Sequence, residues 1–258
     1  VVYNIMKIAI FCPHKLIELF KHALIKERCL EVIFIYEENC IPLKHEYNFD
    51  RNKDFSYDFL VEFGVDLAIV YYWNHLIPKQ ILDEICFFNI HPSMLPKYRG
   101  PHPVIFQLLN KEKYLGVTMH KMDETYDTGE IFLQESVEID YDNIRFLDIK
   151  IFRIAKKMII QLINDYRSGS IVLTKQLDGD ATYFSSNDLS CILNNEIYYA
   201  DFIWMMKIFD IYKPLRIYYN EQIYNVVDYD VKPFKDSLEF NLKDKRVYLK
   251  ISDKDIIR

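Results

Sequence analysis

The sequence predicts an α/β fold with a mostly parallel sheet over residues 6–190, followed by a small β-rich unit over residues 195–258. Two observations support this. Short apolar runs alternate with helical patterns through about residue 122, as expected where crossover helices join parallel strands and cover both faces of the sheet. From about residue 195, Tyr, Ile and Val alternate among turn-forming residues, which is typical of short antiparallel strands.

Three predicted strands and two helices form the first part. The strands are apolar runs rich in β-branched residues, and the helices carry apolar residues at helical spacing. Gly64 follows the second helix, where a glycine can adopt the left-handed conformation that ends a helix. The predicted order is strand 7–11, helix 15–28, strand 31–36, a polar irregular segment 37–54, helix 56–63 and strand 66–72.

The second part continues the alternation and ends on a long helix. Pro78 opens a short helix, a position where its missing N–H costs nothing. A strand, a helix and another strand follow, and a long helical pattern then packs back on the sheet. The predicted order is helix 78–84, strand 87–91, helix 104–110, strand 116–122 and helix 144–164.

Composition limits the classes of partner and compartment. The net charge of −6 disfavours nucleic acid as a partner, because phosphate binding requires clustered Lys and Arg. The five cysteines form no C-x-x-C pair, which fits reduced thiols in a cytoplasmic protein. No apolar run approaches the roughly 20 residues that span a bilayer. We therefore expect a soluble cytoplasmic protein. Its 20 Tyr and 18 Phe residues permit a stacking site for a base or sugar.

The most informative segment is NIHPSMLPKYRG, residues 89–100. Asn89 and His91 are two positions apart, so on a strand both side chains point to one face and can meet the same reacting atom. Pro92, Pro96 and Gly100 then break regular structure, which predicts a loop over the strand end. Ligands bind at such ends in parallel sheets. An isolated N-x-H is more often a turn cap beside a structural histidine, but this context favours a site.

A second segment, GVTMHKMDETYDTGEI, covers residues 116–131. A predicted strand feeds a polar loop in which Asp127 precedes Thr128 and Gly129. That composition turns tightly and can direct a carboxylate inward. Taken alone, D-T-G indicates an ordinary Asx turn. His120 lies on the predicted strand, and no role is assigned to it.

Together the two segments resemble the formyltetrahydrofolate-dependent formyltransferase family, in the N-x-H-P-S-x-L-P-x-Y-R-G run, the G-x-T-x-H-x-M-D strand and the D-T-G-x-I end. The resemblance covers roughly residues 60–190, with a weaker continuation at Gly169, Gln176 and Ala181. It implies a Rossmann-like formyltransferase core, 10-formyltetrahydrofolate as co-substrate, and Asn89, His91 and Asp127 as the catalytic residues. It also implies a pterin pocket lined by Tyr71, Tyr72, Trp73, Leu76, Met122 and Asp123.

The chemistry fits this set of residues. An amine attacks the formyl carbon, and the oxygen of the tetrahedral intermediate gains negative charge that preorganised donors stabilise by about 2.7–4 kcal/mol each. Asn89 and His91 are suitable donors. Asp127 can hold the imidazole in a useful protonation state and accept or relay the amine proton. No metal is required, and the other histidines lack the spacing of a ligand cluster.

Three acceptor classes occur in the family: methionyl-tRNA, glycinamide ribonucleotide and nucleotide-linked amino sugars. The tRNA enzymes typically carry a basic surface and a longer C-terminal barrel, and the ribonucleotide enzymes have a glycine-rich loop after the first strand, where this chain has FCPH. The resemblance therefore favours the sugar N-formyltransferases, with dTDP-4-amino-4,6-dideoxyglucose as acceptor for surface polysaccharide such as O-antigen. Candidate sugar-nucleotide contacts are Ser93, Lys97, Tyr98 and Arg99.

Two expectations remain open. A catalytically silent folate- or nucleotide-binding protein of the same fold is an alternative, although the intact catalytic set speaks against it. The β-rich unit from about residue 200 has short strands with few neighbours, so we expect it to form a homodimer contact or to border the site.

Overall fold

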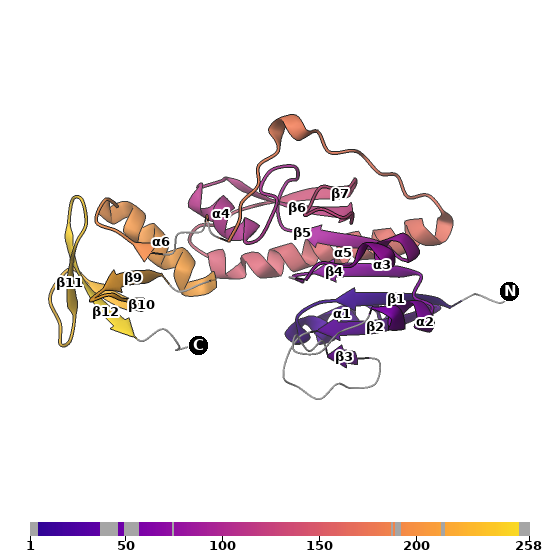
Figure 1. Cartoon of the computed structure of the whole chain (residues 1–258), viewed down its shortest axis with the longest axis horizontal. Helices are drawn as coiled ribbons and strands as arrows, with labels where there is room; N and C mark the ends of the chain where they lie inside the picture. The colour runs from indigo at the N-terminus through magenta and orange to yellow at the C-terminus, as the bar shows by residue number, and fades with distance from the viewer. Residues whose placement is uncertain are drawn as a thin grey trace.

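The structure is a computed structural model that describes residues 5–36, 46–48, 57–73, 75–186, 188, 192–212 and 215–252. Most of the irregular segment predicted over residues 37–54 lies outside these ranges. Its described part, Glu46–Asn48, is the short strand β3. Within the described residues, two sheets and the helices around them form the fold (Figure 1).

The first sheet has seven strands within the described residues, in the order β3-β2-β1-β4-β5-β6-β7. The five strands from β3 to β5 pair in parallel, whereas β6 pairs antiparallel with both β5 and β7. The predicted mostly parallel α/β core is thus confirmed. The bounds are β1 Met6–Phe11, β2 Leu30–Tyr36, β3 Glu46–Asn48, β4 Leu67–Tyr71, β5 Cys86–His91, β6 Tyr114–Lys121 and β7 Ile131–Glu138.

Helices cover both faces of this sheet, and alternate residues of β1 show why. Ile8 and Ile10 belong to one buried cluster with α1, α4 and α5, whereas Ala9 and Phe11 belong to another with α2 and α3. A strand buried on both sides must be apolar where it is covered, as residues 8–11 are. The helices are η1 His14–Leu16, α1 Ile17–Leu24, α2 Asp58–Phe63, α3 Lys79–Glu84, α4 Pro103–Leu109, η2 Ile144–Phe146 and α5 Leu147–Ser168.

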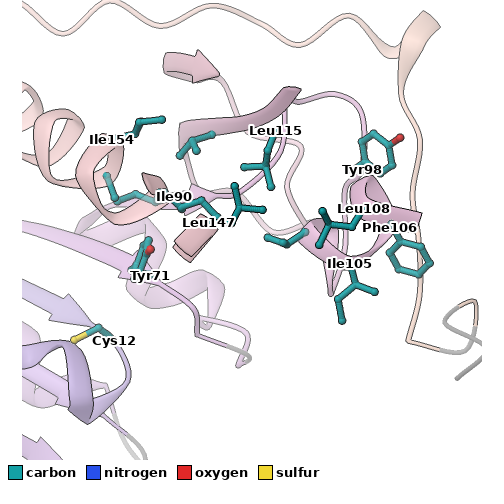
Figure 2. Close-up of a cluster of buried hydrophobic side chains, with 14 of the residues drawn as sticks. Cys12, Tyr71, Ile90, Tyr98, Ile105, Phe106, Leu108, Leu115, Leu147 and Ile154 are labelled. Atoms are coloured by element: carbon teal, nitrogen blue, oxygen red, sulfur yellow. The ribbon is translucent and has the colours of Figure 1, made fainter. Parts of the chain in front are cut away.

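The larger cluster includes Ile90 of β5, Leu115 of β6 and Leu147 of α5, part of which Figure 2 shows. α5 runs along the sheet (Figure 1) and buries one apolar face against it. Gly64 and Gly169 end α2 and α5 in the left-handed conformation. The predicted helix over residues 15–28 is shorter than expected, because it begins as a 3-10 turn and α1 ends at Leu24.

Two sequence interpretations differ from the structure. The strand β7 was not predicted, since its IFLQESVE pattern lies at the exposed edge of the sheet and alternates poorly. Residues 199–212 belong to the predicted β-rich unit but form the helix α6, Tyr199–Tyr212. That part of the prediction was wrong because the apolar residues of this segment do not gather on one face, so its periodicity cannot distinguish strand from helix.

The C-terminal unit is otherwise β-rich, as predicted. Within the described residues, a second sheet has the order β11-β12-β10-β9-β8. Its buried residues join the larger cluster of the core, as do those of α6, which lies beside α4 in Figure 1. No helix among the described residues is long and apolar enough to cross a membrane. The strands are β8 Ile192–Leu193, β9 Arg216–Tyr219, β10 Gln222–Asp230, β11 Leu238–Asn241 and β12 Arg246–Ser252.

Candidate active site

The candidate site lies at the carboxyl end of β5, where the parallel part of the sheet meets the antiparallel strand β6. Asn89 and His91 lie on β5, and Asn89 is paired in register with His120 of β6. Because side chains two residues apart share a face, Asn89 and His91 point together toward the loop that follows β6. His91 is buried, and Asn89 is half-buried.

That loop brings in Asp127. Its Oδ1 lies 3.2 Å from Asn89 Nδ2 and 3.4 Å from His91 Nδ1, and its Oδ2 accepts a hydrogen bond of 2.9 Å from the Gly100 N–H. Asp127 has a φ of 57°, in the left-handed region that non-glycine residues rarely adopt. The structure therefore brings all three predicted catalytic side chains together, with Asp127 in a strained backbone conformation.

The hydrogen bonds of His91 determine its tautomer. Its Nε2 lies 2.7 Å from the Tyr98 carbonyl oxygen, which can only accept, so Nε2 carries the hydrogen. In the neutral ring, Nδ1 is then an unprotonated base that faces Asp127. Burial lowers the pKa of His91, and the nearby Asp127 carboxylate offsets part of this effect. A neutral His91 beside an ionised Asp127 is the arrangement that results near pH 7.

Asp127 stays ionised because its partners outweigh its burial. Burial alone would raise the pKa of this carboxyl group, but His91, His120 and the Gly100 N–H together lower it to about 2. The side chain is only 11% exposed. A fixed negative charge in such a place stabilises positive charge on a neighbouring imidazole.

His120 is the site residue that the sequence analysis did not assign. Its Nδ1 lies 3.0 Å from the Lys121 carbonyl oxygen, so Nδ1 carries the hydrogen in the neutral ring. Its Nε2 lies 3.2 Å from Asn89 Nδ2 and 3.4 Å from Asp127 Oδ1. Sequence pattern gave no signal for it, because the pairing of Asn89 with His120 depends on the register between β5 and β6.

This arrangement also determines which way Asn89 faces. Asp127 Oδ1 and the unprotonated His120 Nε2 both accept hydrogen bonds, so both point to the NH₂ group of Asn89 rather than to its oxygen. The two amide hydrogens thus have partners within the protein. To act on a bound substrate, Asn89 must redirect one of them, and His120 Nε2 is the acceptor that would lose it.

The predicted sugar-nucleotide residues lie in the loop after β5, and three of them hold that loop together. Ser93 Oγ donates to the Lys97 carbonyl oxygen, Tyr98 OH donates to Glu112 Oε1, and Arg99 is buried against Gln176. Lys97 is exposed. Sugar binding by Ser93, Lys97, Tyr98 and Arg99 stays a prediction.

The predicted pterin residues lie at or just after the ends of β4 and β6, the strands on either side of β5. Tyr71 is buried at the end of β4, whereas Tyr72 and Leu76 beyond it are 42% and 55% exposed. Trp73 packs edge-on against Phe11. Met122 and Asp123 follow β6. Asp123 accepts hydrogen bonds from Thr125 and Thr128, so its carboxylate stabilises the loop that leads to Asp127. Contact of these residues with folate stays a prediction.

Comparison with known proteins identifies the class. Residues 36–162 match the family model described as Formyl transferase. Methionyl-tRNA formyltransferase from Kosmotoga olearia is 38% identical over 135 residues, which are 51% of this chain and 43% of that enzyme. The chain thus matches less than half the length of this curated relative, and residues 36–162 carry the formyltransferase sequence pattern.

Solved structures show the same fold over a larger share of their length. A 4-N formyltransferase from Francisella tularensis has a TM-score of 0.69 at 20% identity, with 84% of this chain and 94% of that chain covered. WlaRD, a sugar 3N-formyl transferase solved in the presence of dTDP and 5-N-formyl-THF, has a TM-score of 0.63 at 19% identity, with 98% and 100% covered. The protein has the formyltransferase fold, with a second, C-terminal sheet.

Proposed function

We propose that the protein transfers the formyl group of 10-formyltetrahydrofolate to the amino group of a nucleotide-linked amino sugar. The observation that carries this proposal is the convergence of Asn89, His91 and Asp127 at one strand end, with distances of 3.2–3.4 Å to a single carboxylate oxygen. The formyltransferase match of residues 36–162 supports the reaction class.

His91 is the group that moves the proton. The amine nitrogen attacks the formyl carbon, a C–N bond forms, and Nδ1 of neutral His91 takes the proton that the nitrogen must lose. When the bond between the formyl carbon and N10 of the folate breaks, N10 needs one proton to leave as an amine, and the imidazolium supplies it. One proton is taken and one returned, so the reaction balances without another acid.

Asp127 and Asn89 stabilise the charges that arise on this path. The ionised Asp127, 3.4 Å from His91 Nδ1, stabilises the imidazolium in a buried setting where charges interact strongly. Asn89 redirects one amide hydrogen to the oxyanion, a contact worth about 2.7–4 kcal/mol in comparable sites. His120 Nε2 then faces Asp127 without the Asn89 hydrogen and becomes a second place for a proton.

We propose that the co-substrate binds next to the catalytic residues, at the ends of β4 and β6. Tyr72 and Leu76 expose apolar surface there, and the backbone of Met122 donates to the Phe87 carbonyl oxygen, which fixes the loop after β6 beside β5. A flat pterin ring suits such a surface. The structure of WlaRD was solved in the presence of 5-N-formyl-THF, which supports a folate as the co-substrate of a protein with this fold.

Two observations favour a sugar nucleotide as acceptor. The net charge of −6 gives no general attraction for the phosphates of a tRNA. The fold similarity extends over 100% of WlaRD, which is named a sugar 3N-formyl transferase, and over 94% of the 4-N formyltransferase from Francisella tularensis. We propose dTDP-4-amino-4,6-dideoxyglucose as the first acceptor to test, and a 3-amino sugar as its nearest rival.

Methionyl-tRNA is the second candidate acceptor, because the Kosmotoga olearia relative bears that name and shares 38% identity in the matched region. The family match over residues 36–162 contains the residues that we propose perform formyl transfer, which the two reactions have in common. Its similarity therefore supports the reaction more strongly than the acceptor.

The deciding experiment offers purified protein 10-formyltetrahydrofolate with each candidate amine and follows products by mass spectrometry. We expect one formyl group to be added to an amino sugar nucleotide, with methionyl-tRNA and glycinamide ribonucleotide unchanged. Faster formylation of methionyl-tRNA than of every amino sugar would overturn the acceptor assignment. No formylation of any amine, with folate binding intact, would favour a silent binding protein.

A further inference from the structure

A segment outside the matched residues 36–162 crosses both loops of the candidate site. After α5, residues 170–186 run over β6 and β7 toward α4 (Figure 1). We call this segment the strap. It pairs with β7 through Ile131 and Thr174, and with the loop after β5 through Arg99 and Tyr183. The strap therefore touches the two chain segments that supply the catalytic side chains.

Gln176 of the strap makes four hydrogen bonds, all to these loops. Its amide nitrogen donates to the carbonyl oxygens of Asp127, at 2.9 Å, and Gly129, at 2.7 Å. Its amide oxygen accepts from Arg99 Nε at 3.2 Å and from Arg99 Nη2 at 2.8 Å. Only an uncharged amide can serve two acceptors with one end and a guanidinium with the other.

These bonds act on the backbone at the residue whose conformation is strained. Asp127 has a φ of 57°, which persists only where the surroundings enforce it. Gly129 is equally constrained, since a Cβ atom there would lie 1.7 Å from the Lys121 carbonyl oxygen. Gln176 holds the carbonyl groups on both sides of this turn, so it fixes the direction in which the Asp127 carboxylate points.

The same strap holds the opposite loop. The Tyr98 N–H donates to Thr182 Oγ1 and the Arg99 N–H to the Thr182 carbonyl oxygen. The Phe184 ring stacks on Tyr98, with ring centroids 5.6 Å apart. This loop supplies the Gly100 N–H that binds Asp127 Oδ2. Gln176, through Arg99, thus links the two loops a second time, beside the direct hydrogen bond between Gly100 and Asp127.

We infer that Gln176 is a positioning residue, which aligns the Asp127 carboxylate with His91 by clamping the turn at Asp127 and Gly129 to the loop that carries Arg99. The inference rests on the proposed function, because its effect on rate runs through Asp127. Among the described residues, no hydrogen bond joins Gln176 to His91 or Asn89, so its role is distinct from catalysis itself.

The test begins with two substitutions. Gln176→Met keeps the length of the side chain and removes all four bonds. Gln176→Glu keeps the acceptor for Arg99 but turns a carboxylate toward two carbonyl oxygens. We expect each to lower kcat by about 10- to 100-fold, since small misplacements of catalytic groups have effects of that size, and to change KM for folate less than about twofold. Gln161→Met, on the exposed face of α5, is the matched control.

A double-mutant cycle separates positioning from general damage. If Gln176 acts through Asp127, Gln176→Met should not lower the residual kcat of the Asp127→Ala protein by more than about twofold. A full 10- to 100-fold loss in that background would overturn the inference. So would a native kcat in both Gln176 variants with the melting temperature unchanged.

A further readout needs no activity. Asp127 raises the pKa of His91, whereas burial and His120 lower it, so a misplaced carboxylate should lower the pKa of His91 further. Imidazole ¹⁵N NMR, with the His91 signal assigned from His91→Gln, measures this shift in the folded Gln176→Met protein. An unshifted His91 titration would overturn the positioning role. If the wild-type protein formylates no amine but the shift is present, the proposed function fails while the clamp stands.

Discussion

The catalytic loops and the C-terminal unit are stabilised in different ways. In the loops, residues 91–100 and 123–129, single backbone and side-chain contacts determine the geometry. The Tyr98 carbonyl oxygen orients His91, the Gly100 N–H orients Asp127, and the Lys121 carbonyl oxygen leaves no space for a side chain at Gly129. In the unit that contains α6 and the second sheet, burial of apolar side chains into the common core dominates. Directional contacts include Trp204 to Leu108 of α4, and Lys111 of the turn after α4 to Asp201.

This difference explains where sequence similarity persists. A hydrogen-bonded constellation tolerates few residue types, because a missing donor leaves a buried group unsatisfied. An apolar layer tolerates many, provided that volume and pattern are kept. The family match covers residues 36–162 and so includes the loops but not the C-terminal unit. We therefore expect substitutions in the loops to affect rate and those in the unit to affect stability alone.

The largest expected effect comes from Asp127→Ala. Without the carboxylate, the imidazolium of His91 loses its counter-charge and Asn89 loses an acceptor. We expect kcat to fall on the order of 10³-fold, with the dissociation constant for folate nearly unchanged. Steady-state kinetics and isothermal titration measure the two quantities. Asp142→Ala, an exposed surface change, is the control and should retain full activity.

A near-native rate for Asp127→Ala would remove this residue from the mechanism. Weak folate binding in the same variant would instead place Asp127 in the binding of folate. The two outcomes lead to different revisions, so both measurements are needed.

The next effect is the pH dependence that His91 imposes. His91 must be neutral to accept the proton, and its pKa lies below the ordinary 6.5 because of burial. The rate should be constant at neutral pH and fall as the pH drops through this lowered pKa. The pKa of Asp127 is lowered to about 2 by its partners, so this carboxyl group should not change the rate in that pH range. A profile of kcat/KM against pH reports the pKa of the free enzyme.

His91→Gln provides the check on this assignment. The variant should lose on the order of 10²-fold in rate and lack the acid limb. Survival of that limb would assign it to another group. Stability depends on pH in the same direction as the rate. Below pH 6.5 the unfolded chain takes up a proton at His91 that the folded chain does not. The free energy of unfolding therefore decreases as the pH is lowered.

Much of the fold was predictable because its signals are local. In the runs KIAIF, EVIFIY and DLAIVYY, residues 8–11, 33–36 and 67–71 are buried on both faces, so their composition alone identifies strands. β7 was missed because it is an edge strand with four exposed and four intermediate residues, without regular alternation. α6 was mistaken because the burial of a mostly apolar segment without a single apolar face is decided by its neighbours, α4 and the second sheet.

The candidate site was predictable only in part. The spacing of Asn89 and His91 places them on one face of a strand, and the structure confirms that face. His120 depends on the register between β5 and β6, and Gln176 on a contact across 49 residues with Asp127. Neither distance is encoded in local pattern. The orientation of the Asn89 amide could be assigned only once the positions of its two acceptors, on Asp127 and His120, were known.

A third prediction concerns the space within the loops. In Gly129→Ala the new Cβ would lie 1.7 Å from the Lys121 carbonyl oxygen, so the backbone must move. We expect a loss of about 2–4 kcal/mol in the free energy of unfolding, measured by urea denaturation. Gly179→Ala is the matched control, because no atom lies within 4 Å of its Cβ position and its φ is unstrained. Equal stability of both variants would show that the loops adapt more readily than the comparison implies.

The smallest effect is expected from Trp204→Phe in α6. The change removes the 3.1 Å hydrogen bond from Trp204 Nε1 to the Leu108 carbonyl oxygen but keeps an aromatic ring near Tyr141. We expect a loss of about 1 kcal/mol, an unchanged kcat, and a single unfolding transition, since α6 and the second sheet share the core of the first sheet. Tyr218→Phe, at a position 61% exposed, should leave stability unchanged. Two separate urea transitions in the wild-type protein would instead make residues 195–258 a domain that folds on its own, and the loss in Trp204→Phe would then appear only in the docking of that domain on α4.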